Sequence, residues 1–501
     1  MRLLKLLLPM VAIIGILDAS YITWEKVNHV IPPCSPGFAC ETVLTSKWAS
    51  IGPVPLSALG LLFYVSVLLI ASLLFLEIPY IKIAKSKFSV FQILQFLTAF
   101  GFLFSLYLVF VMGVLIQGWC LYCLFSAATS TTLFILTRAL KGDPKETDLH
   151  REIISFLYSQ VLKPIFFHFD PEFIHHQMVV TGVFLGSFGL GKWFTKQMFS
   201  YQNPKLEKDL AGIHFTNPVG LSAGFDWDAD LPEILPYVGF GFATIGTVTL
   251  ESYAGNERPR LSRFPDSKAL LVNKGFQSMG ARALIKKLNE KTFAIPIGIS
   301  IGATNRQYRD MEEQMNEIVK AFKLFENSKV DHSYYELNIS CPNLTTGQPF
   351  TKPSTLSKLL SKLDVLDIAR PVFVKMPIDL PVSDTMALIE QMKKHKWIIG
   401  VILGNLTKDH ANPAVTTADR EKWRTMRGNL SGKPTFERSN NLIRATRKKF
   451  GKRFIIVGTG GIFTPEDAKI KMKCGADLVQ LITGMIYEGP QLIGQINKEL
   501  V

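Results

Sequence analysis

Short apolar runs alternate with amphipathic stretches through residues 206–501. Eight such runs end in polar or glycine-rich tips, at residues 217–224, 241–249, 295–302, 334–341, 371–377, 398–405, 453–460 and 476–484. Continuous runs rich in Val, Ile and Leu are typical of parallel strands that helices cover on both faces. Residues 312–325, 354–366 and 383–394 have the amphipathic pattern of such helices. The pattern predicts an α/β fold, a (β/α)8 TIM barrel.

The chemistry of such a barrel lies at the carboxyl ends of its strands. The tips of the eight runs are therefore candidate active-site residues. They carry Ser222, Thr247, Ser300, Asn338, Cys341, Lys375, Asn405, Gly460 and Thr483.

The first 140 residues have a different pattern, with four apolar stretches at about 3–24, 54–76, 88–115 and 120–140. Each is long enough to cross a bilayer. A cleavable signal peptide is the alternative for the first stretch, but no small-residue cleavage pattern follows it and three more apolar stretches do. We expect a four-helix transmembrane bundle.

Three clusters of basic residues flank these stretches, all on one side. They are Arg2, Lys5, Lys82, Lys85, Lys87, Arg138, Lys141 and Lys145. Lys and Arg are enriched in cytoplasmic loops, so the barrel should be cytoplasmic, and loops 25–52 and 117–119 should lie outside the cell membrane. The net charge of +14 is spread over the barrel and the inner loops. Without a nucleic-acid motif or a basic stripe, an acidic bilayer surface is the expected neighbour.

Four of the six cysteines fall on the outer side of this topology: Cys34, Cys40, Cys120 and Cys123. An oxidising compartment favours disulfides there, whereas the two barrel cysteines, Cys341 and Cys474, should stay reduced. The C-x-x-C of Cys120 and Cys123 supports a redox-active disulfide whose first thiolate lies at a helix start. Inert structural disulfides are the alternative. No metal site is expected, because only His29 is near.

A charged segment with Pro and Gly near its start, residues 141–163, predicts a domain boundary. The apolar stretch 178–199 that follows is interrupted by glycines and by Lys192 and Lys196. A fifth span is the alternative, but amphipathic helices against the membrane fit better. We therefore divide the chain into a membrane domain at 1–142, a linker with membrane-contacting helices at 143–205, and a barrel at 206–501.

The tips of the last two strands indicate a phosphate site. Gly458–Gly461 and Thr483–Gly484 offer free backbone amides, and a helix starts near Thr464. Such groups bind a phosphate without a lysine, as in FMN or a sugar phosphate. Glycines used only for tight packing are the alternative.

Two further tips carry ionisable or hydrogen-bonding groups. Lys375 ends an apolar strand, where it could form a Schiff base or face an electron-rich cofactor. The segment 338–343 offers two amides, Asn338 and Asn343, around the thiol of Cys341. Amides suit a flat polar heterocycle, and a thiol can act as a base towards a carbon acid. An inert buried cysteine is the alternative.

Residues 1–140 resemble the vitamin K epoxide reductase family of membrane thiol oxidoreductases. The matching segments are 17–21, the pair Cys34 and Cys40, 40–46, 52–55, 104–107 and 119–123. The resemblance implies that Cys120 and Cys123 pass electrons to a quinone held among the helices. It also implies that Cys34 and Cys40 relay electrons from a thioredoxin-like partner outside, by thiol–disulfide exchange.

Residues 165–501 resemble dihydroorotate dehydrogenase, a flavin enzyme of pyrimidine synthesis. The matching segments are 170–175, 217–226, 246–249, 255–260, 338–343, 374–375, 430–434, 458–461 and 484–490. The helices at 165–200 are similar to those of the membrane-bound branch that uses quinone. The cysteine at position 341 is instead like the soluble branch.

The resemblance implies FMN across the strand tips with a dihydropyrimidine stacked on it. The residues that would contact FMN are Ala223, Gly224, Thr247, Ser300, Lys375, Ser431, Gly432, Gly460, Gly461, Thr483 and Gly484. Those that would hold the substrate are Asn338, Asn343, Asn405 and Asn273. Cys341 would take the C5 proton of dihydroorotate while hydride leaves C6 for the flavin.

Three positions depart from the family pattern. Trp227 stands where the family has a lysine, Leu406 where it has a threonine, and Asn273 is displaced by one residue. Each change removes or moves a polar contact to the substrate. We therefore carry two further hypotheses: a flavin oxidoreductase on another dihydropyrimidine-like ring, and a membrane domain that is only an anchor with structural cysteines.

Overall fold

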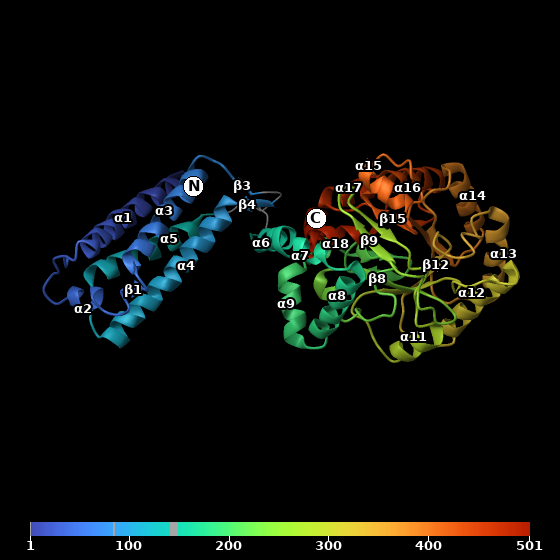
Figure 1. The fold of residues 1–501 in the computed structure, drawn as a ribbon, viewed down its shortest axis with the longest axis horizontal. Coiled ribbons are helices and arrows are strands. Elements are labelled where there is room, and N and C mark those ends of the chain that lie inside the picture. Colours follow the sequence, from blue (N-terminus) through green and yellow to red (C-terminus); the bar gives the residue numbers. More distant parts are fainter. Residues whose placement is uncertain (1, 84–85, 141–148) are drawn as a thin grey trace. The chain divides into compact units, whose positions relative to one another are not determined.

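The computed structural model describes residues 2–83, 86–140 and 149–501, which belong to two compact units, Met1–Phe156 and Leu157–Val501 (Figure 1). Lys85, Lys141 and Lys145, used above for the topology, lie outside the described residues.

The first unit is a bundle of four long helices that run side by side (Figure 1). They are α1 (Arg2–Val27), α3 (Leu56–Phe75), α4 (Val90–Phe110) and α5 (Leu121–Ala139). Helix α1 packs on α3 and α5, and α4 packs on the same two helices. Between them lies a core that includes Leu8, Tyr64, Leu94 and Leu133. The predicted four-helix bundle is confirmed as a fold.

Three helical segments among the described residues of this unit are long and apolar enough to cross a membrane: Leu4–Val27, Leu56–Phe75 and Val90–Ile116. The last includes the π-helical turn η1 (Val111–Ile116) at the end of α4. Helix α5 is not among them, because its 19 residues include a run of hydroxyl side chains from Thr129 to Thr132. Membrane association follows from the three segments, while the fourth crossing stays a prediction.

Short elements fill the loops of this bundle. They are α2 (Cys40–Leu44), β1 (Ser50–Ile51), β2 (Val54–Pro55), β3 (Tyr80–Ile83) and β4 (Ser86–Ser89).

The second unit contains a closed parallel barrel of eight strands. They are β7 (Val219–Leu221), β8 (Phe242–Val248), β11 (Ile297–Ile301), β12 (Tyr334–Asn338), β13 (Val372–Met376), β14 (Ile398–Leu403), β16 (Ile455–Thr459) and β17 (Leu478–Leu481). Every one lies inside a predicted apolar run, and they pair in chain order until β17 meets β7. The prediction of a (β/α)8 barrel is confirmed.

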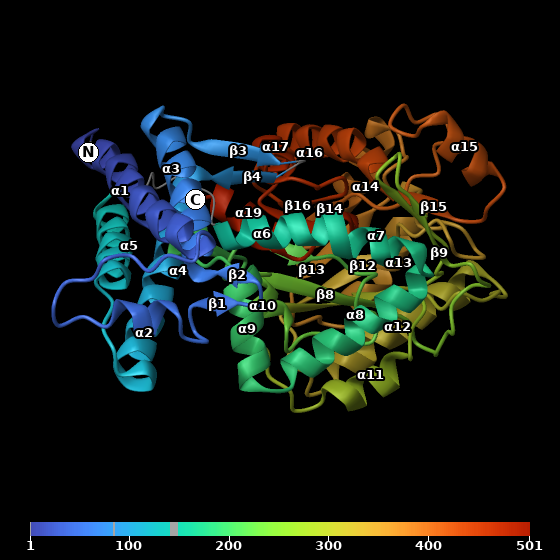
Figure 2. The same cartoon turned by 60° about the vertical axis from the view of Figure 1, so that its left-hand side comes forward.

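Helices surround these strands (Figure 2). They are α10 (Leu235–Val238), α11 (Ala281–Leu288), α12 (Met311–Glu326), α13 (Pro353–Asp364), α14 (Val382–Met392), α15 (Thr417–Arg424), α16 (Phe436–Phe450), α17 (Pro465–Lys473), α18 (Thr483–Glu488) and α19 (Gln491–Glu499). Leu, Ile, Val and Phe side chains from strands and helices form one core between the two layers. A hairpin of β5 (Lys208–Leu210) and β6 (Ile213–Phe215) packs its Phe215 against Phe242 of β8.

A three-stranded antiparallel sheet was not expected from the apolar pattern. Its strands are β9 (Leu261–Phe264), β10 (Ala269–Val272) and β15 (Asn429–Gly432), with β10 in the centre. Each has four residues, and β15 is far from the other two in sequence, so no local pattern reveals the pairing. This sheet supplies part of the active-site wall described below.

The segment before the barrel is helical, with α6 (Leu149–Leu157), η2 (Tyr158–Leu162), α7 (Lys163–His168), α8 (Pro171–Gly186), α9 (Gly189–Phe199) and η3 (Pro204–Leu206). The apolar stretch 178–199 is divided between α8 and α9, which are bent by 116° at their junction. With 16 and 11 residues, neither helix alone reaches the roughly 20 residues that a straight span needs.

Candidate active sites

A cavity of about 180 Å³ opens at the carboxyl ends of the barrel strands. Its wall comes from the tips of seven strands, from the three-stranded sheet and from His175 of α8.

Most of the predicted barrel residues line this cavity. They are Ala223, Gly224, Thr247, Asn338, Cys341, Asn343, Lys375, Asn405, Ser431, Gly432, Gly460, Gly461, Thr483 and Gly484. Ser300 and Asn273 are not in the wall. The Ser300 hydroxyl is 3.0 Å from Thr247 Oγ1 and donates to Glu336 Oε1 at 2.7 Å. Asn273 accepts a bond from Asn256.

Lys375 is held as a buried cation. Its Nζ lies 3.1 Å from Ser222 Oγ and 3.7 Å from Glu336 Oε1, and the Glu336 side chain is fully buried. The pair forms because β12 and β13 are neighbours, with Asn338 opposite Lys375 in register. A buried charge is tolerated only when it is paired. These partners favour a fixed cation over a Schiff base, which needs a neutral amine.

Three amides at the ends of β12 and β14 share hydrogen bonds with protein groups. Asn338 Nδ2 donates to Thr247 Oγ1 at 2.8 Å, and its Oδ1 accepts from Ser340. Asn405 Nδ2 donates to Ser340 Oγ at 2.6 Å, and Asn343 Nδ2 donates to the Val272 carbonyl at 2.8 Å.

An amide side chain has two N–H donors. The bonds between described residues therefore leave one N–H on each of Asn338, Asn343 and Asn405 for a ligand. These three donors are fixed in position around one part of the cavity, which suits a flat ring with carbonyl groups on its edge.

Cys341 lies in the same loop, and its side chain is buried. Burial raises the pKa of its thiol to about 11, while the charge of Lys375 opposes this shift. The thiol is therefore protonated at neutral pH, and its thiolate fraction grows as the pH rises.

A second layer of asparagines, not identified from the sequence, fixes the Asn343 loop. Asn256 Nδ2 donates to the Asn343 carbonyl at 3.1 Å, and Asn429 Nδ2 donates to Asn343 Oδ1 at 2.5 Å. Asn305 Nδ2 donates to Asn256 Oδ1 at 2.8 Å, and Asn305 Oδ1 accepts from the Thr345 amide at 2.6 Å.

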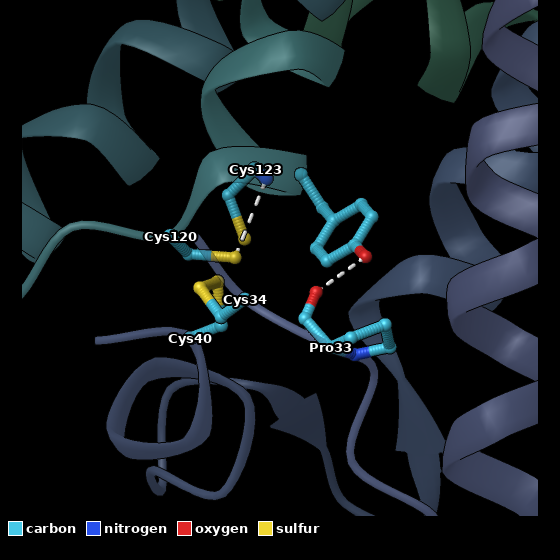
Figure 3. The surroundings of a disulfide bond; sticks show 6 residues. Pro33, Cys34, Cys40, Cys120 and Cys123 are labelled. Carbon is cyan, nitrogen blue, oxygen red and sulfur yellow. Dashed lines mark hydrogen bonds between the residues drawn. A yellow bond between two sulfur atoms is a disulfide. The ribbon is translucent and has the colours of Figure 1, made fainter. Parts of the chain in front are cut away.

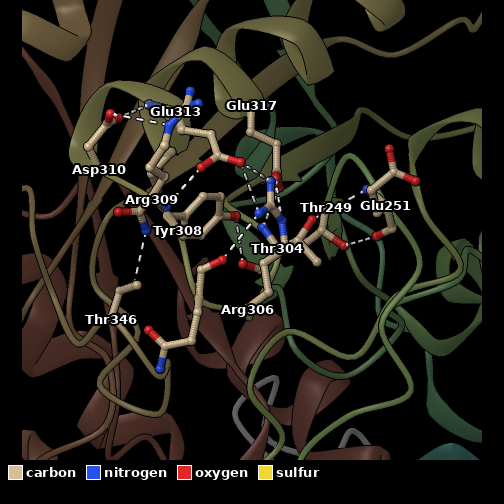
Figure 4. A network of polar contacts seen from close by, with 12 residues as sticks. Thr249, Glu251, Thr304, Arg306, Tyr308, Arg309, Asp310, Glu313, Glu317 and Thr346 are labelled. Atoms are coloured by element: carbon tan, nitrogen blue, oxygen red, sulfur yellow. Dashed lines mark hydrogen bonds and ion pairs between the residues drawn. The ribbon is translucent and has the colours of Figure 1, made fainter.

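The Asn305 loop is in turn tied to α12 (Figure 4). The Thr304 amide donates to Glu317 Oε1 at 2.7 Å, and Arg306 binds both Glu317 and Glu313. Tyr308 donates its hydroxyl hydrogen to the Thr304 carbonyl at 2.7 Å. This network makes the loop after β11 a rigid support, although β11 itself contributes nothing to the wall.

The glycine tips of β16 and β17 bring backbone close to the cavity. Gly460 and Gly461 have φ values of +95° and +74°, and a Cβ at either would overlap Thr435 or Phe436. The hydroxyls of Ser431 and Thr483 lie 2.9 Å apart beside them. Backbone amides and hydroxyls of this kind suit a phosphate.

The expected contribution of the helix start near Thr464 is wrong. This start of α17 is closed by its own capping box with Asp467, which accepts from the Phe463 and Thr464 amides at 3.0 Å. None of these residues lines the cavity.

A cluster of ionic and aromatic groups, also missed in the sequence, completes the wall. Glu172 of α8 lies 3.4 Å from Lys274 and 3.0 Å from Arg260. Lys274 Nζ lies 3.9 Å from the ring centre of Trp227, and His175 stacks on Trp227 at 4.8 Å. Glu172 and Lys274 are 102 positions apart, so only the fold brings them together.

Four cysteines gather in the first unit (Figure 3). Cys34 and Cys40 form a disulfide, whereas Cys120 and Cys123 are free thiols, with the Cys123 amide 3.5 Å from Cys120 Sγ. Cys120 is the N-cap of α5, as predicted. All four belong to one cluster with Val43 and Met112.

A second cavity, of about 700 Å³, lies within the helix bundle. Cys123 lines it, together with Asp18, Tyr64 and Ser126, but most of its wall is apolar. The arrangement places one thiol of the C-x-x-C beside a space large enough for an apolar ring.

Two family models match the chain. The dihydroorotate dehydrogenase model matches residues 205–501, and the vitamin K epoxide reductase family model matches residues 6–138. The chain belongs to the dihydroorotate dehydrogenase family. It is therefore an oxidoreductase, with an N-terminal vitamin K epoxide reductase family domain that indicates a second redox function.

Curated relatives match the dihydroorotate dehydrogenase part of the chain and support this family assignment. Dihydroorotate dehydrogenase (quinone) from Trichodesmium erythraeum is 34% identical over 361 residues, which are 69% of this chain and 94% of that protein. The protein of the same name from Christiangramia forsetii is 35% identical over 357 residues, 69% of this chain and 99% of that protein.

A solved structure shares the fold. The crystal structure of DHODH from Eimeria tenella in complex with ferulenol matches with a TM-score of 0.57 at 22% identity, covering 66% of this chain and 90% of that one.

Proposed function

We propose that the barrel unit oxidises dihydroorotate to orotate with FMN, in pyrimidine synthesis, and passes the electrons to a membrane quinone. The observation that carries this proposal is the meeting of Cys341, three amide donors and the cation of Lys375 in one cavity. The relatives bear the same activity in their name.

The residues that line the cavity are of the kinds that would hold FMN. Lys375 would face the flavin ring, Ala223, Gly224 and Thr247 would line it, and Ser300 would support Thr247 from behind. Gly460, Gly461 and the hydroxyls of Ser431 and Thr483 would hold the phosphate, with Gly432 and Gly484 beside them. FMN, when bound, supplies a two-electron acceptor that can be reoxidised by quinone.

The protein groups would then do the rest of the chemistry. Asn338, Asn343 and Asn405 would orient the ring through their remaining N–H groups, and Cys341 would remove the C5 proton. The loop, in which Cys341 is buried, would exclude water from the reacting face. Because the amides are already fixed by neighbouring residues, little ordering is needed when substrate binds.

The quinone would approach beside α8. His175 lines the cavity, and its Nε2 is buried without a hydrogen-bond partner among the described residues. Burial and the Lys274 charge lower its pKa to about 3, so the ring is neutral. Its other nitrogen bonds the Phe225 backbone, so Nε2 would accept a bond from a quinol hydroxyl.

The first unit would be a thiol-dependent quinone reductase of the cell membrane. Oxidation of the Cys120–Cys123 dithiol to a disulfide releases two electrons and two protons, which reduce a quinone to a quinol. Cys34 and Cys40 would then exchange with this disulfide and accept electrons from a thioredoxin-like protein outside. With the barrel in the cytoplasm, the two units would share a quinone pool.

A spectroscopic and steady-state assay of the full chain in membranes or detergent tests the proposal. The expected result is an FMN spectrum and quinone reduction that depends on dihydroorotate. The alternative substrate class, another dihydropyrimidine-like ring, rests on Trp227 and Leu406 in the cavity wall. Turnover of dihydrouracil or dihydrothymine in preference to dihydroorotate would favour it over the first proposal. A membrane unit that serves only as an anchor would reduce no quinone with thiols.

A further inference from the structure

The wall of the barrel cavity carries an unbalanced positive charge that the mechanism above does not use. Among the residues that the structure describes, Glu172 is the one carboxylate within 4.0 Å of Arg258, Arg260 and Lys274. Arg258 is exposed, whereas the other members of the cluster are largely buried. One carboxylate cannot balance three cations, so this part of the wall favours an anion.

Lys274 is the member of this cluster that reaches the cavity. A lysine ammonium has three N–H donors. One points to Glu172 at 3.4 Å and another side of the group lies over the Trp227 ring at 3.9 Å. The Trp227 ring, itself stacked on His175, therefore positions the ammonium without consuming its last donor.

The backbone places Lys274 beside the loop that carries the base. The Asn256 amide donates to the Lys274 carbonyl at 3.1 Å, and Asn256 Nδ2 donates to the Asn343 carbonyl. Asn343 is two residues after Cys341. A ligand held by Asn343 and next to Cys341 therefore lies beside the loop that carries Lys274, which lines the same cavity.

We propose that Lys274 is the residue that binds the carboxylate of the ring substrate, and that it makes the cavity selective for an anionic dihydropyrimidine over an uncharged one. This inference rests on the proposed dihydroorotate activity and adds its specificity determinant. Trp227 acts as the platform that aims the ammonium. A charge-assisted bond from lysine to carboxylate is stronger than a bond between neutral groups, so its loss affects charged ligands selectively.

The test measures binding of orotate to the full-length protein by calorimetry, with dihydroorotate KM and FMN content measured in parallel. Lys274→Gln should weaken orotate binding and raise KM by at least tenfold at unchanged FMN content. Lys274→Arg, which keeps the charge, should stay within about threefold of the wild type. Lys358→Gln on α13, an exposed position away from the cavity, is the control for loss of one positive charge.

Orotate affinity measured over a series of pH values adds a second readout, which a merely structural role of Lys274 would not change. Burial lowers the pKa of Lys274 to about 8, against the opposing effect of Glu172. Orotate affinity of the wild type should therefore fall as the pH rises through 8, and that of Lys274→Arg should not. The charged and titratable groups facing Lys274 are Glu172, Arg258, Arg260 and His175, and His175 is neutral throughout because its pKa is about 3.

The outcomes separate the two proposals. If dihydroorotate does not reduce the wild-type flavin, the proposed function fails. Equal orotate affinity of the wild type and Lys274→Gln overturns the role of Lys274, whatever the wild type oxidises. A parallel loss of affinity in Lys274→Gln and Lys274→Arg also overturns it, because the charge would then not be what matters.

Discussion

The two cavities of this chain are both proposed to reduce quinone, yet they are built in opposite ways. The barrel cavity is surrounded by amides, hydroxyls and cations whose positions are fixed by further hydrogen bonds, as Asn343 is by Asn256 and Asn429. The bundle cavity has a mostly apolar wall with one thiol, Cys123, at its edge. The first design selects one polar ring, whereas the second admits an apolar molecule and needs only a thiol within reach.

The largest expected effect comes from removing the barrel thiol. Cys341→Ala should lower dihydroorotate oxidation by about 10²–10⁴-fold, which is the usual contribution of a general base. Thiol-dependent quinone reduction in the same preparation should be unchanged. Stopped-flow reduction of the flavin measures dihydroorotate oxidation, and quinone absorbance with dithiothreitol measures thiol-dependent quinone reduction. Residual fast reduction in Cys341→Ala would show that another group removes the proton.

The reciprocal change affects the other cavity. Cys120→Ala should abolish thiol-dependent quinone reduction, because no disulfide can form with Cys123, and should leave dihydroorotate oxidation intact. Thiol-dependent reduction that persists in this variant would mean that the four cysteines of the first unit are structural. Together, Cys341→Ala and Cys120→Ala thus test whether the chain has two independent active sites.

The buried ion pair is expected to matter for stability as well as for the flavin. Glu336→Leu leaves the Lys375 charge without its carboxylate, and removing one partner of such a pair typically costs about 3–5 kcal/mol. Chemical denaturation of the full chain measures the loss, with FMN content as a second readout. Stability equal to that of the wild type would mean that Ser222 and Ala223 alone satisfy the lysine.

The rate of flavin reduction in the barrel cavity should depend on pH through the Cys341 thiol. Because burial raises the pKa of Cys341 to about 11, a thiolate base predicts that flavin reduction speeds up about tenfold per pH unit from pH 7 towards 10. The profile is measured at saturating dihydroorotate. A flat profile across this range would contradict proton removal by the thiolate.

The smallest effect is expected in the second layer of asparagines. Asn429→Ala removes one bond to Asn343 Oδ1 and should raise the KM for dihydroorotate a few-fold, in line with about 1 kcal/mol for a single hydrogen bond. Steady-state kinetics measure it. An effect as large as that of Cys341→Ala would indicate that Asn429 contacts the ring itself.

The sequence predicted the barrel well because each strand is a continuous apolar run, such as residues 371–377 around β13. The rule that barrel active sites lie at the carboxyl ends of the strands located Lys375, Asn338 and Cys341. It failed where a side chain points behind the wall, as Ser300 does, or where a loop caps its own helix, as at Thr464.

Lys274 and Glu172 could not be found in this way. The contact between them depends on how α8 packs against the three-stranded sheet, whose central strand β10 ends at Val272 just before Lys274. No periodic pattern encodes a contact between segments so far apart in the sequence. The fourth membrane crossing, expected at residues 120–140, stays a prediction, because the hydroxyl groups of α5 weaken its apolar signal although the helix packs in the bundle.

The most direct test of the account is anaerobic titration of the purified full-length protein with dihydroorotate, followed by the flavin absorbance. The account predicts bleaching of the flavin at stoichiometric dihydroorotate, reoxidation on adding quinone, and no bleaching at the same concentration of dihydrouracil, which lacks the carboxylate. A flavin that dihydroorotate leaves oxidised, or that dihydrouracil bleaches equally well, would contradict it.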